Sequence, residues 1–316
     1  MPQQPPAKPR EIWIDVARCV AMAFIMSLHA GAAPHALNTP VGGAICLFFV
    51  LAGYFTPRQA RAAALRALRL GVAWLLWSLL SLGLYIAVHT GTAWDWAHAF
   101  GIGTAAYNTP LWFLKDLCVF QLIMAALMAL RLLPRYGWFT CALLAAFTYA
   151  AEPQQHEALR FSWLPAVLLG YALRGSIPTP SQLRSAAVRH SRLIIAAGAL
   201  LILQHTFYPR LLHSFGIRAT SCALPIQPLI WATWYALVAI GITALLPRTA
   251  GVIALAGSCM LFIYAGHVPA YSPFYHIHMP PTWGTVIMLG LIPALCAAHA
   301  ALARLLPGIT RLLTAR

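Results

Sequence analysis

The first apolar segment of the chain, at about 12–31, carries three side chains that could do chemistry: Asp15, Arg18 and His29. Asp15 and Arg18 are three residues apart, so on a helix they can pair on one face. Ten residues lie between Arg18 and His29, and the resulting step of eleven positions on a helix brings them to within about 20° of one direction and roughly 16 Å apart along the axis. Arg18 would suit a phosphate, and a neutral imidazole at His29 could deprotonate a hydroxyl. The alternative is that Arg18 extends to a polar surface and His29 is a hydrogen-bonded interfacial histidine.

A second basic group, Arg66-Ala-Leu-Arg69, stands where the loop after the second apolar segment becomes the third. Its i, i+3 spacing would place two guanidinium groups on one helix face, a geometry that suits a phosphate or pyrophosphate. The alternative is anchoring at the cytoplasmic surface, a role shared with Arg58 and Arg61.

Polar residues also open the fourth apolar segment, where Lys115 and Asp116 follow Trp112. These three could bind a polar substrate; the alternative, which the sequence alone favours, is interfacial anchoring. His276 and His278 could suggest a metal site, but two ligands without a nearby carboxylate or thiol are too few. We therefore expect no metal.

The composition indicates that the chain folds in a lipid membrane and not in water. The chain has 316 residues, of which 61% are hydrophobic and only 9% charged, whereas a soluble domain is about 25% charged. The sequence therefore predicts an all-α, polytopic integral membrane protein with about ten transmembrane helices. The predicted helices lie at about 12–31, 41–56, 70–89, 111–131, 137–151, 161–174, 193–208, 225–246, 251–270 and 282–303. The fifth and sixth are short enough to be re-entrant, so nine or eleven spans would also fit.

The distribution of the basic residues predicts the topology. The formal charge is +15, but the basic residues recur in short groups between apolar segments, which argues against a nucleic-acid partner. Nearly all of them fall on alternate connections; the exceptions are Arg160, Arg210, Arg218 and, within spans, Arg18 and Lys115. The positive-inside rule then puts both termini in the cytoplasm.

We expect one domain, a transmembrane unit at 12–303 between cytoplasmic tails at 1–11 and 304–316. The basic start and first apolar run also resemble a signal peptide. The charges of Asp15 and Arg18, and the odd number of spans that cleavage would leave, favour a retained helix. The seven cysteines form no C-x-x-C motif, so we interpret them as buried small hydrophobes.

Several of these groups occur together as ordered motifs. The set comprises Arg18 and His29 ten residues apart, Phe48-Phe-Val-Leu-Ala-Gly53, Arg66-x-x-Arg69, Thr109-Pro-Leu-Trp-Phe-Leu114 and Tyr264-Ala-Gly-His267. In this order, across most of the chain, the set resembles acyltransferase family 3, a family of bacterial membrane-bound O-acyltransferases.

The resemblance implies transfer of an acyl group, usually acetyl, from cytosolic acyl-coenzyme A to a hydroxyl of a carbohydrate or glycolipid acceptor. The expected location is the bacterial cytoplasmic (inner) membrane, surrounded by membrane lipids, and the resemblance leaves open a separate periplasmic partner. It implies that His29 is the catalytic histidine and that Arg18, Arg66 and Arg69 bind the donor's phosphates. His267 is expected in the substrate site.

Two departures from the family pattern affect the expected site. Ala52 stands where serine is common, so a hydroxyl role is absent there. The segment 31–45 contains no acid that could orient His29. His35, Asn38 or the pair Lys115-Asp116 could replace that acid, and an altered or inactive site would also fit.

Two other functions stay open at this stage. A transporter or flippase for a lipid-linked sugar or small solute would also use buried charges and broken helices, although no inverted repeat is visible. An inactive accessory subunit would not bind coenzyme A.

Overall fold

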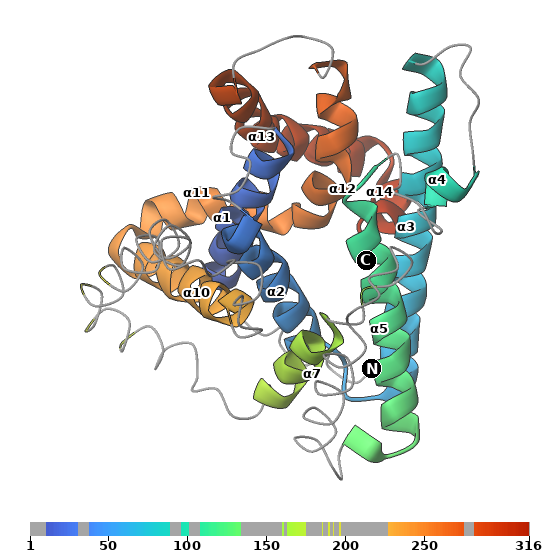
Figure 1. Cartoon of the computed structure of the whole chain (residues 1–316), viewed down its shortest axis with the longest axis vertical. Coiled ribbons are helices and arrows are strands. Elements are labelled where there is room, and N and C mark those ends of the chain that lie inside the picture. The colour runs from blue at the N-terminus through green and yellow to red at the C-terminus, as the bar shows by residue number, and fades with distance from the viewer. Residues whose placement is uncertain are drawn as a thin grey trace, which may run out of the picture.

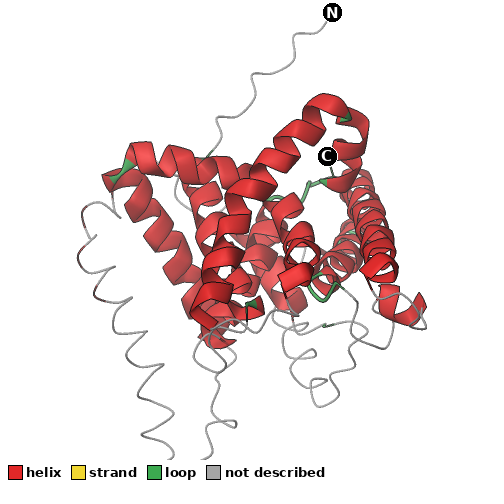
Figure 2. Ribbon diagram, turned by 90° about the horizontal axis from the view of Figure 1, so that it is seen from above, coloured by secondary structure: helices red, strands yellow, loops and turns green. Residues whose placement is uncertain are grey.

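The structure is a computed structural model, and it describes most of the predicted spans. The described residues are 11–30, 38–88, 96–100, 108–133, 160, 163–174, 227–274 and 281–315, with 185, 189, 192 and 196. Every regular element among them is helical, as the composition predicted, and Figure 2 shows these helices from above. The predicted spans at 137–151 and, apart from residue 196, 193–208 lie outside the described residues.

The helices vary widely in length. They are α1 (Ile12–His29), α2 (Asn38–Tyr54), α3 (Ala60–Val88), α4 (Trp96–Phe100), α5 (Leu111–Ala129), α7 (Leu164–Leu173), α10 (Gln227–Leu245), α11 (Pro247–Ser258), α12 (Met260–Tyr271), the 3₁₀ helix η3 (Ser272–Phe274), α13 (Pro281–Leu305) and α14 (Pro307–Leu313). Among the described residues, five helices are long and apolar enough to cross a membrane: α1, α3, α5, α10 and α13. The joined pair of α11 and α12 would give a sixth.

The helix α1 is the centre of the bundle. It packs against α2, α10, α11, α12 and α13. To one side, α3 and α5 run alongside each other, while α2 packs between α7 and α10 (Figure 1). The first predicted span, with its charged residues, is therefore inside the protein.

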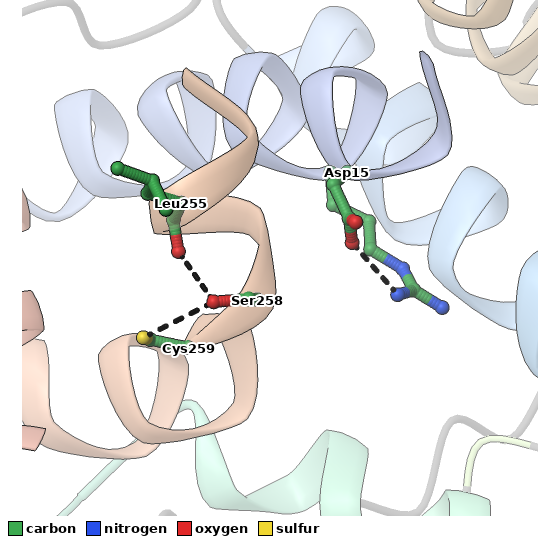
Figure 3. Close-up of polar contacts among 5 residues, drawn as sticks. Asp15, Leu255, Ser258 and Cys259 are labelled. Atoms are coloured by element: carbon green, nitrogen blue, oxygen red, sulfur yellow. Dashed lines mark hydrogen bonds and ion pairs between the residues drawn. The ribbon is translucent and has the colours of Figure 1, made fainter. Parts of the chain in front are cut away.

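The segment 251–270, predicted as one span, is broken in the structure. The helices α11 and α12 meet at Cys259 with a bend of 70°. At the break, the Ser258 hydroxyl donates back to the carbonyl oxygen of Leu255 at 2.6 Å, and this pair is drawn in Figure 3. Such back-bonding at a Gly-Ser pair, here Gly257-Ser258, is a common cause of sharp helix kinks.

The third helix begins earlier than predicted. We expected the third helix at about 70–89, with Arg66 and Arg69 where the loop becomes the helix, but α3 starts at Ala60. The segment between these points consists of Ala, Arg and Leu, which all have high helix propensity. Arg66 and Arg69 therefore both lie on α3, and the orientation of this helix about its axis determines which way each side chain points.

The C-terminal residues 304–315, within the segment predicted as a cytoplasmic tail, pack against the bundle. Residues 304 and 305 complete α13, and α14 packs against α3. The indole nitrogen of Trp77 donates to the carbonyl oxygen of Leu313 at 3.1 Å. Figure 1 shows α14 beside α3.

Two glycines allow α2 and α7 to approach closely. A Cβ atom placed on Gly53 would collide with the carbonyl oxygen of Val167, and one on Gly170 would collide with that of Val50. Helix contacts of this kind in membranes depend on small residues. The glycine that ends the Phe48–Gly53 motif thus brings α7, and the Arg174 that follows it, to the end of α2.

We predict that Gly53→Ala destabilises the protein by about 1–3 kcal/mol, because the added methyl group overpacks a backbone contact. Gly42→Ala is the control, since no atom lies within 4 Å of a Cβ built on Gly42 in the same helix. Thermal unfolding in detergent compares the two. Equal stability of both variants would contradict this view of the α2–α7 contact.

Candidate functional site

A cavity of about 350 Å³ lies between α1, α2, α3, α5, α12 and the C-terminal residues. Apolar side chains such as Phe48 and Phe113 form much of its lining. Arg18 and Arg66 are the charged residues of that described lining, and Tyr264 adds a hydroxyl-bearing ring. The structure therefore brings together two of the predicted phosphate-binding arginines.

Arg18 is held by an acid and by an aromatic ring. Its guanidinium lies 3.4 Å from the Asp15 carboxylate, the pairing that the spacing predicted. The position of Asp15 on α1 is visible in Figure 3. The same guanidinium lies over the ring of Phe55, 5.3 Å from its centroid, within the range of a cation–π contact.

Two further arginines bind backbone carbonyls near the end of α2. Arg66 donates to the carbonyl oxygen of Ala52 at 3.4 Å, and Arg174 donates to that of Thr56. The last carbonyls of a helix have no partner within the helix and carry partial negative charge, so they attract cations. Arg18 and Arg174 are both close enough to Arg66 to interact with it electrostatically. We refer to Arg18, Arg66 and Arg174 as the arginine cluster.

The arginine cluster keeps its positive charge. A backbone carbonyl accepts a hydrogen bond from a guanidinium but does not neutralise its charge. Among the described residues, Asp15 is the carboxylate that pairs with a member of the cluster, Arg18. Three clustered cations with one acid, two of them (Arg18 and Arg66) in the cavity lining, can therefore bind a phosphate or pyrophosphate.

The sequence did not identify Arg174, and the structure separates Arg69 from the cavity. Arg174 was counted among the basic residues of a cytoplasmic connection, and only the contact between α7 and α2 places it beside Arg66. Arg69 is exposed and is not among the described lining residues, whereas Arg66 is partly buried. The assignment of Arg69 to the donor's phosphates stays a prediction.

His29, at the end of α1, lies against a second histidine. Its ring centroid is 5.2 Å from that of His267, which is completely buried in α12. The ring of His267 is in turn 6.1 Å from that of Tyr264, a residue of the cavity lining. His29 is thus connected to the cavity by way of His267 and Tyr264.

Two of the sequence motifs are joined by hydrogen bonds. The Tyr264 hydroxyl donates to the carbonyl oxygen of Pro110 at 2.5 Å. Two residues before Pro110, the Asn108 amide donates to the carbonyl oxygen of Ala265 at 2.7 Å. The Thr109–Leu114 and Tyr264–His267 motifs, 150 residues apart in the chain, therefore form one unit beside His29.

Arg160 organises the residues expected to bind substrate on α5. Its guanidinium lies over the Trp112 ring, 4.1 Å from the centroid, and its backbone N–H donates to the Asp116 carboxylate at 3.2 Å. Asp116 is buried, and its other oxygen has no hydrogen-bond partner among the described residues. Lys115 is partly buried next to it. The sequence placed Arg160 on the side opposite the cytoplasm but did not link it to this group.

Other candidates lie outside the described part of the chain. His35, His276 and His278 are in segments that the structure does not describe, and the same is true of the Asn38 side chain. Within the described residues, no group of three or more His, Cys, Asp or Glu could hold a metal ion.

The apolar helices and the partly charged cavity define a multi-pass membrane protein with a site that suits a phosphorylated ligand. Residues 11–301, nearly the whole chain, match the family model described as Acyltransferase domain. The chain belongs to this family, acyltransferase family 3, which confirms the resemblance of the motifs and indicates an enzyme that transfers acyl groups. No curated protein and no solved structure matches the chain significantly.

Proposed function

We propose that this protein moves an acyl group, acetyl in the simplest case, from cytosolic acyl-coenzyme A to a hydroxyl of a carbohydrate or glycolipid. Its place would be the bacterial inner membrane, with both termini in the cytoplasm. The observation that carries the proposal is the arginine cluster at a cavity whose lining residue Tyr264 packs against His267, which in turn packs against His29. A periplasmic partner stays a prediction.

Coenzyme A carries the negative charge that would complement the arginine cluster. Its phosphates would supply the negative charge for Arg18, Arg66 and Arg174, and each contact would be a charge-assisted hydrogen bond. Its long pantetheine arm would then extend along α1, on which Arg18 and His29 are separated by roughly 16 Å. The thioester would reach the histidine pair while the phosphates stay at the cluster.

The chemistry at His29 would be general base catalysis. The imidazole takes the proton of the acceptor hydroxyl as the hydroxyl oxygen attacks the thioester carbonyl carbon. The carbon–sulfur bond then breaks, and the coenzyme A thiolate leaves with the proton returned by the imidazolium. Asp116, Lys115 and Trp112, together with Arg160, are the proposed contacts of the acceptor.

We expect that His29→Ala lowers transfer from radiolabelled acetyl-coenzyme A to a glycan acceptor about 10²–10⁴-fold, the usual contribution of a general base. The purified variant should bind coenzyme A as the wild type does, because the arginine cluster is unchanged. Full activity of His29→Ala would remove His29 from the mechanism.

The arginine cluster generates a separate prediction for donor binding. Arg66→Ala and Arg174→Ala should each raise the KM for acetyl-coenzyme A about tenfold or more, since each loses a charged hydrogen bond. Arg61→Ala, exposed on the same helix as Arg66, is the control and should leave this KM unchanged. Equal effects at all three positions would indicate that general surface charge, not the cluster, attracts the donor.

One observation favours a transporter as the second candidate. Helices broken within the membrane, as α11 and α12 are at Cys259, frequently form solute sites in transporters. Reconstituted vesicles separate the two functions. A transporter would move a lipid-linked sugar without any acyl donor, whereas the proposed enzyme would require acyl-coenzyme A.

A further inference from the structure

The hydrogen bonds of His267 fix which of its ring nitrogens carries a proton. Its Nδ1 lies 2.7 Å from the carbonyl oxygen of Tyr264 and 3.3 Å from that of Ile263. Carbonyl oxygens only accept hydrogen bonds, so Nδ1 must be the donor. In the neutral ring, Nε2 is then left as an acceptor with a free lone pair.

That acceptor is buried beside His29. His267 has no exposed surface, and its Nε2 has no hydrogen-bond partner among the described residues. Buried polar atoms are rarely left unpaired, and those that are call for an explanation. The ring of His29 has its centroid 5.2 Å away, and two imidazoles joined by an N–H···N bond have centroids about 5 Å apart. The separation of the two rings therefore matches that of a hydrogen-bonded imidazole pair.

We propose that His267 is the positioning residue of His29, and that its Nε2 accepts the N–H of the His29 ring. This inference rests on the proposed role of His29 as base. The bond would hold one tautomer of His29, with its second nitrogen unprotonated and directed at the acceptor hydroxyl. When His29 takes the proton, the hydrogen bond from its N–H to His267 becomes charge-assisted and therefore stronger.

A neutral orienting group fits this part of the protein. The segment 31–45 has no Asp or Glu, and a carboxylate at the depth of His267 would add a buried charge to an apolar body. An imidazole provides the acceptor without that charge. Because His267 is fully buried and is not among the described cavity-lining residues, its place in the site is to hold His29 and not to contact the substrate.

Two substitutions of His267 distinguish a role in orienting His29 from a role in core packing alone. His267→Gln retains an acceptor oxygen at the end of the side chain, near the place of Nε2. His267→Asn retains an amide that can donate to the Tyr264 carbonyl but is too short to reach His29. Acetyl transfer by the purified full chain is measured as kcat and as KM for acetyl-coenzyme A, with the thermal unfolding midpoint of each variant. His299→Asn in α13 is the control for the same change at another histidine.

We expect His267→Asn to lower kcat about 100-fold with the KM for acetyl-coenzyme A unchanged, and His267→Gln to recover kcat to within about tenfold of wild type. Equal kcat values for the Asn and Gln variants would overturn the inference, because the acceptor atom would then not matter. Wild-type kcat in His267→Asn would overturn it as well. If His29→Ala abolishes transfer in that same experiment, the proposed function stands without this inference; if His29→Ala is fully active, the proposed function itself fails.

Discussion

Donors buried in an apolar helical body must find acceptors, and in this protein backbone carbonyl oxygens meet much of that requirement. Arg66 and Arg174 bind carbonyls at the end of α2, and Tyr264 binds that of Pro110. A carbonyl satisfies the donor but leaves its charge in place. Positive charge therefore remains concentrated at the arginine cluster, where a phosphate can bind, because few carboxylates are present to neutralise it.

Carbonyls that lack an N–H partner within their own helix occur where helices end or break, and parts of the site lie at such places. The arginine cluster surrounds the end of α2, and the Tyr264–His267 motif follows the bend between α11 and α12 at Cys259. The close contact at Gly53 brings α7 and its Arg174 to the same point. Helix breaks and glycines thus position the charged side chains, while the long helices supply the apolar enclosure.

Local periodicity was enough to predict the helical class and the Asp15–Arg18 pair, since both depend on neighbours along one helix. The early start of α3 was not predicted, because hydropathy treats arginines as loop residues although their helix propensity is high. Arg174 could not be found from spacing, because only a tertiary contact between α7 and α2 places it beside Arg66. The pairing of His29 with His267 likewise joins residues that are far apart in the chain, and the motifs indicated each histidine but not their contact.

A donor bound by the arginine cluster is expected to place its acyl end beside the two histidines. Photolabelling with a coenzyme A thioester whose acyl group carries a diazirine tests it directly, with labelled peptides located by mass spectrometry. We expect label in α12 around Tyr264–His267 or at the end of α1, and loss of that label when free coenzyme A is added. Label confined to the exposed face of α13, or insensitive to coenzyme A, would contradict it.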